Sequence, residues 1–213
     1  MRLWMIAEAT VWERLQHEQC LWVDPNCIDS EWFGQAYQWM CRQMAKRLPT
    51  YQGHFPWWAW HRWDTSSAKP DLRNRQMLHG GVPPGTPMVR LELDLPADRV
   101  LLSDFDLWHF VLNPGYLGWT EAETDAFTAQ WERTPPLERD TSSLERSWER
   151  IFLLAYPLAD PAWFGGNAAT RIQGVFEELR REDIRQVTRY RARPTQEAAR
   201  VLAHSSRQNR EED

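Results

Sequence analysis

The densest group of side chains with binding chemistry begins at Trp57, in a run of seven residues that holds four tryptophans. Alternation along an extended strand places Trp58 and Trp60 on one face. Trp57, His61 and Trp63 then share the opposite face. An indole buries a large area and offers a flat surface on which a base or an adenine ring can stack. The run predicts a strand with a ring-stacking face, and a strand packed on both faces is the alternative.

A charged loop, residues 69–75, follows this strand. Lys69 and Arg73 supply cations that can hold a phosphate or a carboxylate, and Asp71 can orient them. Binding groups are often found in loops carried by a rigid scaffold. We therefore expect a ligand-binding loop here, with a solvated charged loop as the alternative.

A second polar group begins at Ser103, where the sequence predicts the start of a helix. Ser103 is expected to cap this helix, and the carboxylates of Asp104 and Asp106 suit its positive end. Asp106 and His109 lie three residues apart, which on a helix allows a carboxylate to orient an imidazole. The segment is either a helix cap alone or a cap combined with a general base.

Two later segments add polar candidates. Glu149 lies in a predicted helix, and Gln173, Val175 and Glu177 share one face of the predicted strand at residues 172–179. A polar residue inside a central strand is unfavourable unless it is paired or functional. Gln173 is therefore a candidate site residue, although placement on an edge strand would remove the inference.

The sequence contains none of the glycine-rich nucleotide fingerprints and none of the common hydrolase or zinc-protease motifs. Its three cysteines, Cys20, Cys27 and Cys41, do not have the C-x-x-C spacing of zinc sites or redox motifs. We therefore predict no metal site and expect the cysteines to be ordinary packing residues in a reducing compartment.

The composition is that of one globular domain: 213 residues, 42% hydrophobic and 26% charged. We expect the domain to cover residues 1–193 and a polar tail, frayed or disordered, to cover residues 194–213. No apolar run is long enough for a membrane span, and the first residues do not resemble a signal peptide, so we expect a cytoplasmic protein with no membrane partner. The net charge of −5 argues against binding nucleic acid with the whole surface.

Hydrophobic periodicity predicts both strands and helices. The expected strands cover residues 3–6, 55–63, 88–95, 99–102, 172–179 and 184–190. Helices are expected to start near Thr10, Ser30, Ser103, Thr120 and Ser143. Thr10 and Thr120 each begin a capping box, and Ser30 is expected to cap its helix. Because these elements do not alternate strictly, we predict an α+β domain with a small sheet and flanking helices rather than a doubly wound sheet.

Several segments resemble an uncharacterised bacterial family of about this length, whose hallmark is a Ser-Asp-Phe tripeptide. The matching segments are Leu3-Trp4, Tyr37-Gln38-Trp39-Met40, Trp58-Ala59-Trp60, Lys69-Pro70-Asp71-Leu72-Arg73, Leu101-Leu102-Ser103-Asp104-Phe105-Asp106-Leu107-Trp108-His109, Ser147-Trp148-Glu149-Arg150-Ile151-Phe152 and Ile172-Gln173. This resemblance extends to about Arg193 and assigns no activity.

The order of the elements is also similar to that of small bacterial ADP-ribosyltransferases. The resemblance implies a small split or mixed sheet, with NAD in a cleft between two short sheets. It places the first binding position at Trp4 to Ile6, the second at Trp58 to His61, and the last at Gln173. In that family a glutamate occupies the last position, so here Glu177 would have to supply the carboxylate.

Together these expectations describe an NAD-binding protein that transfers ADP-ribose to a nucleic acid or protein acceptor. Glu177 or Glu149 would supply the anion, and Arg73 would hold the pyrophosphate. The expected pocket is lined by Trp58, Trp60, Lys69, Arg73, Asp104, His109 and Gln173. A binding module for nucleotides or single-stranded nucleic acid, without catalysis, is the alternative, and a third possibility is that the 14 tryptophans only build the core. The oligomeric state is left open.

Overall fold

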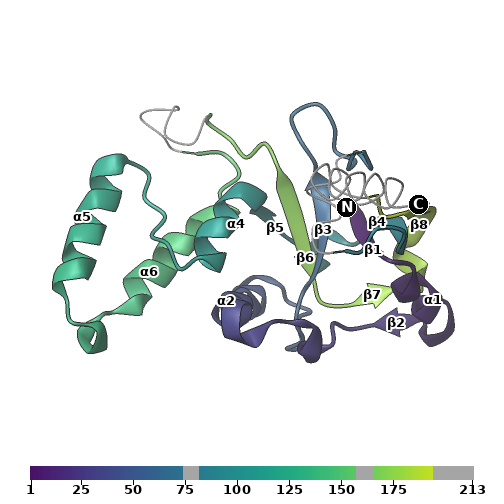
Figure 1. The fold of residues 1–213 in the computed structure, drawn as a ribbon, viewed down its shortest axis with the longest axis horizontal. Coiled ribbons are helices and arrows are strands. Elements are labelled where there is room, and N and C mark those ends of the chain that lie inside the picture. The colour runs from purple at the N-terminus through teal and green to yellow at the C-terminus, as the bar shows by residue number, and fades with distance from the viewer. Residues whose placement is uncertain (74–81, 157–165, 194–213) are drawn as a thin grey trace, which may run out of the picture.

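A computed structural model describes residues 1–73, 82–156 and 166–193 (Figure 1). The expected α+β class is confirmed: helices flank a six-stranded sheet whose order is β5-β6-β3-β1-β4-β8. The strands of this sheet are β1 (Arg2–Glu8), β3 (Trp57–Arg62), β4 (Pro87–Asp94), β5 (Leu101–Asp104), β6 (Ile172–Phe176) and β8 (Ile184–Arg191). A separate two-stranded ribbon pairs β2 (Cys20–Leu21) with β7 (Leu179–Arg180). The predicted tail, residues 194–213, lies outside the described residues.

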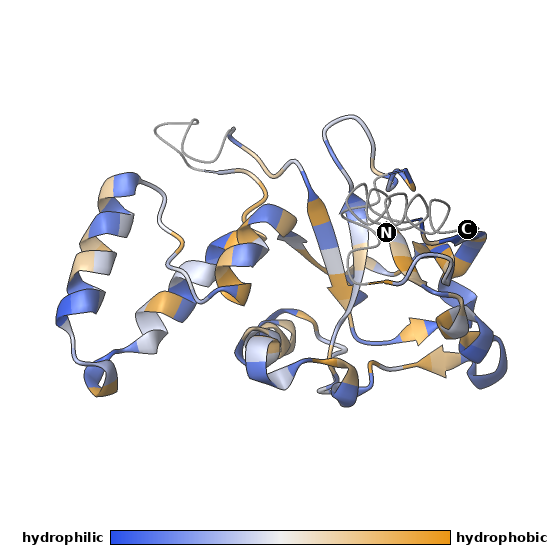
Figure 2. Ribbon diagram, viewed as in Figure 1, coloured by the Kyte–Doolittle hydropathy of each residue, from blue (hydrophilic) through white to orange (hydrophobic). Residues whose placement is uncertain are grey.

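The described chain also contains five α-helices. They are α1 (Ala9–Glu18), α2 (Ser30–Arg47), α4 (Phe105–Leu112), α5 (Glu121–Arg133) and α6 (Thr141–Trp148), and a 3-10 turn, η4 (Glu149–Phe152), follows α6. None of the described helices is long and apolar enough to cross a membrane. α5 contains no buried residue and lies at the far end of the molecule, where Figure 2 colours it mostly as hydrophilic.

The six-stranded sheet consists of two three-stranded halves. β1 pairs with β4 at seven positions, from Arg2 to Glu8. By contrast, β1 pairs with β3 at one position, Trp4 opposite Trp60. The half β5-β6-β3 is therefore joined to the half β1-β4-β8 at a single residue pair, and the two strands are unpaired beyond it.

One face of the sheet carries a continuous apolar core. Val89, Leu91 and Leu93 of β4 are fully buried, as the alternation of this segment predicts, and they pack with Leu3 and Leu15. Gly174 of β6 faces this core. A Cβ atom at that position would come within 2.8 Å of Val100, so a larger residue would not fit. This face is therefore tightly packed at Gly174.

The second core lies between the helices and the half β5-β6-β3. Trp39 of α2 and Trp148 of α6 are buried there, with ring centroids 5.6 Å apart in an edge-to-face arrangement. Trp58 and Trp108 pack against the same core, with centroids 4.8 Å apart. Many of the tryptophans are thus core residues. The second core covers only part of its sheet face, which is the face that Leu91 does not occupy.

Three predicted helix caps are wrong in detail. α1 begins at Ala9 without the capping box expected at Thr10, and Asp29 rather than Ser30 caps α2 by accepting a hydrogen bond from the Trp32 N–H. Asp104 rather than Ser103 caps α4. The cap at Thr120 is confirmed, since its hydroxyl accepts from the Glu123 N–H. Aspartate is as good a cap as serine, so adjacent candidates cannot be ranked from sequence alone.

The predicted assignment of side chains to the two faces of the aromatic strand is also partly wrong. The register of β3 against β6 shifts between Trp60 and Arg62, which marks a bulge. A bulge adds one residue and breaks the alternation of side chains. As a result Trp63 packs against Trp60, with ring centroids 4.7 Å apart, instead of lying on the opposite face.

Candidate functional site

Four predicted site residues form one row across neighbouring strands. Trp4 of β1 lies opposite Trp60 of β3, Trp60 lies opposite Gln173 of β6, and Gln173 lies opposite Ser103 of β5. Directly opposed residues in antiparallel strands project from the same face. We call Ser103, Gln173, Trp60 and Trp4 the polar row. It ends on Glu92 of β4, which lies opposite Trp4.

The polar row contains hydrogen-bonding groups without partners. Ser103 is 0% exposed and its hydroxyl has no hydrogen bond. Trp4 is 8% exposed and its indole N–H has none either. Gln173 is half-buried, and its strand β6 is paired on both sides. Gln173 is therefore not on an edge strand, and it stays a candidate site residue. Buried polar groups usually have partners, and exceptions mark a ligand or water site.

Ser103 is free because its neighbour does the capping. Asp104 Oδ1 accepts hydrogen bonds from the N–H groups of Asp106 and Leu107, at 2.7 and 2.9 Å. Its other oxygen accepts from the Tyr156 hydroxyl. Burial raises the pKa of Asp104, and the Tyr156 hydrogen bond opposes that rise. Asp104 is therefore a structural residue that positions the end of β5.

A hollow of about 400 Å³ opens where β1 and β3 separate. Ile6 of β1 and Trp58 of β3 line it, and each is two residues from the polar row on its own strand. Tyr37 of α2 also lines it, with its ring centroid 6.1 Å from that of Trp58. A volume of this size can hold one ring system. The hollow and the polar row together form the candidate site.

The loop that follows β3 covers the row. Leu72 and Trp63 pack on Trp60, and Phe105 packs on it from α4. Of the two predicted phosphate ligands in this loop, Arg73 is bound to Asp71 at 2.7 Å and its side chain is 86% exposed. Lys69 has no hydrogen bond or ion pair from its side chain among the described residues.

The predicted pair of Asp106 with His109 is not formed. Asp106 binds Arg171, which comes from the segment before β6. The Nδ1 atom of His109 lies 3.0 Å from the carbonyl oxygen of Phe105, one helical turn earlier. A cation from a distant segment competes better for the carboxylate than a neutral imidazole does. His61, at the bulge, contacts the Arg2 carbonyl and lies outside the row.

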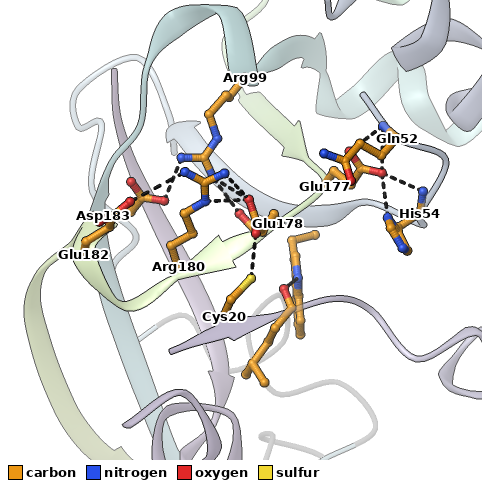
Figure 3. A network of polar contacts seen from close by, with 11 residues as sticks. Cys20, Gln52, His54, Arg99, Glu177, Glu178, Arg180, Glu182 and Asp183 are labelled. Carbon is orange, nitrogen blue, oxygen red and sulfur yellow. Dashed lines mark hydrogen bonds and ion pairs between the residues drawn. The ribbon is translucent and has the colours of Figure 1, made fainter. Parts of the chain in front are cut away.

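Neither predicted catalytic glutamate belongs to the polar row. Glu177 accepts hydrogen bonds from the backbone N–H groups of Gln52 and His54 and contacts the His54 ring at 2.9 Å (Figure 3). Glu149 is bound by Lys46 and Arg47 of α2, which lower its pKa although burial raises it. Both carboxylates hold the fold together at a distance from the row.

Replacing Glu177 with alanine should lower the free energy of unfolding by about 1 kcal/mol, because the exposed N–H groups of Gln52 and His54 lose their acceptor. Urea denaturation of the full chain measures this loss. Glu182→Ala is the matched control, since Glu182 is 74% exposed and 3.6 Å from Arg180, and should change stability by less than about 0.5 kcal/mol. Equal losses in both variants would contradict the structural assignment of Glu177.

A family profile described as "Domain of unknown function (DUF3841)" matches residues 2–185. The chain belongs to this family. The DUF3841 match includes every strand of the polar row, and β8 lies almost wholly beyond it. The resemblance to an uncharacterised family is thereby confirmed, whereas the resemblance to ADP-ribosyltransferases stays a prediction. No curated protein and no solved structure matched the chain.

Sequence reasoning did not select three residues around the candidate site: Tyr37, Arg90 and Glu92. The alternation of β4 had placed Arg90 and Glu92 on the face away from the apolar core, and this was the available signal. Tyr37 reads as one member of a helical stripe, so only the tertiary structure places it at the hollow. Within the described ranges, no three His, Cys, Asp or Glu side chains gather where they could hold a metal ion.

Proposed function

We propose that this protein binds a nucleotide whose ring lies in the hollow beside the polar row, and that NAD is the first ligand to test. The observation that carries the proposal is the single-pair junction of Trp4 and Trp60, where the two half-sheets separate and the hollow begins. The cytoplasmic location and the nucleic acid or protein acceptor expected from the sequence remain part of this proposal.

The chemistry of the walls suits a planar polar ring. Trp58 and Tyr37 provide aromatic surfaces for stacking. Gln173 does not line the hollow but lies beside it in the polar row, and its amide can donate to and accept from a carboxamide or nucleobase that extends to the row. Together these groups would satisfy both the flat face and the polar edge of nicotinamide or adenine.

A single nucleotide is favoured over a nucleic-acid strand. Trp60 is 7% exposed and Trp4 is 8% exposed, whereas proteins that bind single strands offer accessible aromatic side chains to successive bases. If the protein is a binding module without catalysis, a single nucleotide is therefore a more suitable ligand than single-stranded nucleic acid.

ADP-ribosyl transfer would break the bond between the nicotinamide nitrogen and C1′ of the ribose. Nicotinamide leaves with the bonding electrons, and the acceptor binds C1′ and loses a proton. Gln173 can offer only a dipole to the positive charge that develops, whereas Glu92 beside Trp4 is an anion. Glu92 is held by Arg2 at 3.3 Å. It is therefore the carboxylate to replace when turnover is measured.

Calorimetric titration of the full chain with NAD, ADP-ribose and nicotinamide tests the proposal. Gln173→Ala should weaken NAD and nicotinamide binding about tenfold, equivalent to about 1.4 kcal/mol for a lost polar contact. Gln38→Ala is the matched control, because Gln38 is exposed on α2, and it should bind as the wild type does.

Turnover separates the enzyme from the binding module. Release of nicotinamide from NAD that stops in Glu92→Gln, with NAD affinity retained, would support the transferase. NAD binding without any release of nicotinamide would support the module instead. A wild-type protein that binds none of the three ligands would overturn the proposed function.

A further inference from the structure

Arg90 is a half-buried cation with almost no partners. It projects from β4 on the same sheet face as the polar row, two residues from Glu92. One guanidinium nitrogen donates to the Pro70 carbonyl oxygen at 3.0 Å, and the side chain makes no other hydrogen bond and no ion pair in the described chain. A guanidinium has five N–H groups, so most of its donors are unused.

No carboxylate makes an ion pair with Arg90 within the described chain, and Glu92 and Asp71 each pair with another arginine. Glu92 is bound by Arg2 at 3.3 Å, and Asp71 is bound by Arg73 at 2.7 Å. Both carboxylates still attract Arg90, so this residue has negative charge nearby but no direct counter-ion. Burial lowers the pKa of Arg90, and the nearby negative groups oppose that shift. A half-buried guanidinium with unused N–H groups can bind an anion as a direct partner.

Arg90 is also well placed relative to the hollow. It lies directly opposite Ile6, which lines the hollow. Opposed side chains in antiparallel strands have Cβ atoms about 5 Å apart. Arg90 is therefore carried on the strand next to the one that lines the hollow. Lys69, which precedes Pro70, adds a second cation without a partner.

We propose that Arg90 is a phosphate-binding residue, and that the site takes the pyrophosphate of a nucleotide with Lys69 as the second cation. The pyrophosphate accepts hydrogen bonds from the unused N–H groups of Arg90 while Pro70 keeps the side chain in place. This inference rests on the proposed function for the identity of the nucleotide, but the affinity for the anion can be measured separately.

Calorimetric titration of the full chain with inorganic pyrophosphate tests the anion site without reference to the ring site. The wild type should bind pyrophosphate, and Arg90→Gln should weaken this binding about 10- to 100-fold, as expected for hydrogen bonds to a charged group. Arg90→Gln should weaken ADP-ribose binding by the same factor and change nicotinamide affinity less than twofold.

Arg189→Gln is the matched control, because Arg189 is an exposed arginine on the neighbouring strand β8, opposite Val89. It should bind pyrophosphate as the wild type does. If Arg90→Gln fails to fold, Lys69→Gln replaces it, since Lys69 lies in a loop and its loss should weaken pyrophosphate binding severalfold. Circular dichroism confirms the fold of each variant.

The outcomes separate this inference from the proposed function. Pyrophosphate binding that depends on Arg90, in a protein that binds no nicotinamide or NAD, would keep the anion site and remove the nucleotide. Nicotinamide binding that depends on Gln173, in a protein that does not bind pyrophosphate, would overturn the anion site alone. Equal loss of pyrophosphate binding in Arg90→Gln and Arg189→Gln would also overturn it, because it would show nonspecific charge attraction.

Discussion

Replacing Trp148 with alanine should lower the free energy of unfolding by about 3–5 kcal/mol, the loss typical of a large aromatic removed from a core. Trp148 is 0% exposed and packs edge-to-face on Trp39. Its indole N–H donates to the Gly115 carbonyl oxygen at 2.7 Å, so the substitution also removes a hydrogen bond. Guanidinium denaturation followed by circular dichroism measures the loss.

Trp32 supplies the matched control for Trp148. It lies in the first turn of α2 and is 74% exposed, so Trp32→Ala should change stability by less than about 0.5 kcal/mol. Similar losses in the two variants would contradict the division of the tryptophans into core and surface groups. A large loss in Trp148→Ala alone would show that Trp148 serves packing. Trp58, which lines the hollow, is then the tryptophan to test for ligand binding.

The strands were the most predictable part of the fold. β4 was expected at residues 88–95 and is found at Pro87–Asp94, because strict alternation of apolar and polar side chains is a local signal. The order of the strands was not predictable in the same way. Pairing of Gln173 with Trp60 and Ser103 joins segments far apart in the sequence, and no local pattern specifies which segments meet.

The sequence could predict which residues belong to the candidate site, but it could not predict how they are arranged in space. Trp4, Trp60, Gln173 and Ser103 were all expected from separate local arguments or from the resemblance, and the sheet register brings them together. The chemistry expected of Asp106 failed because Arg171, 65 residues later, competes for the carboxylate. Local spacing can show that two side chains are able to meet, but a third partner decides whether they do.

Ser103 shows the same limit at the scale of a single residue. Ser103 and Asp104 are adjacent, and either can cap a helix. The structure gives that role to Asp104 and leaves the Ser103 hydroxyl buried in the polar row without a partner. A difference of one residue in the cap therefore decides which of the two side chains is left without a hydrogen-bond partner.

Replacing Asp104 with alanine should lower the free energy of unfolding by about 3 kcal/mol. The substitution removes the cap of α4 and also leaves the Tyr156 hydroxyl without the carboxylate that it binds. Urea denaturation measures the loss. Asp104→Asn is the matched variant, because its side-chain oxygen can still cap the helix, and it should lose about 1 kcal/mol or less. Equal losses in the two variants would contradict the capping role.

The pH dependence of the free energy of unfolding, compared between the wild type and Asp104→Asn, tests the burial of Asp104. Burial raises the pKa of this carboxyl in the folded protein, so the folded state holds the proton more readily than the unfolded state does. The contribution of Asp104 to stability is then greatest below the unfolded pKa of about 3.9 and is lost as the pH rises through the folded pKa. Asparagine does not titrate, so the stability advantage of the wild type over Asp104→Asn should decrease over that range. An advantage that instead grew with pH would show that the Tyr156 hydroxyl and the α4 N–H groups stabilise the carboxylate more than burial disfavours it.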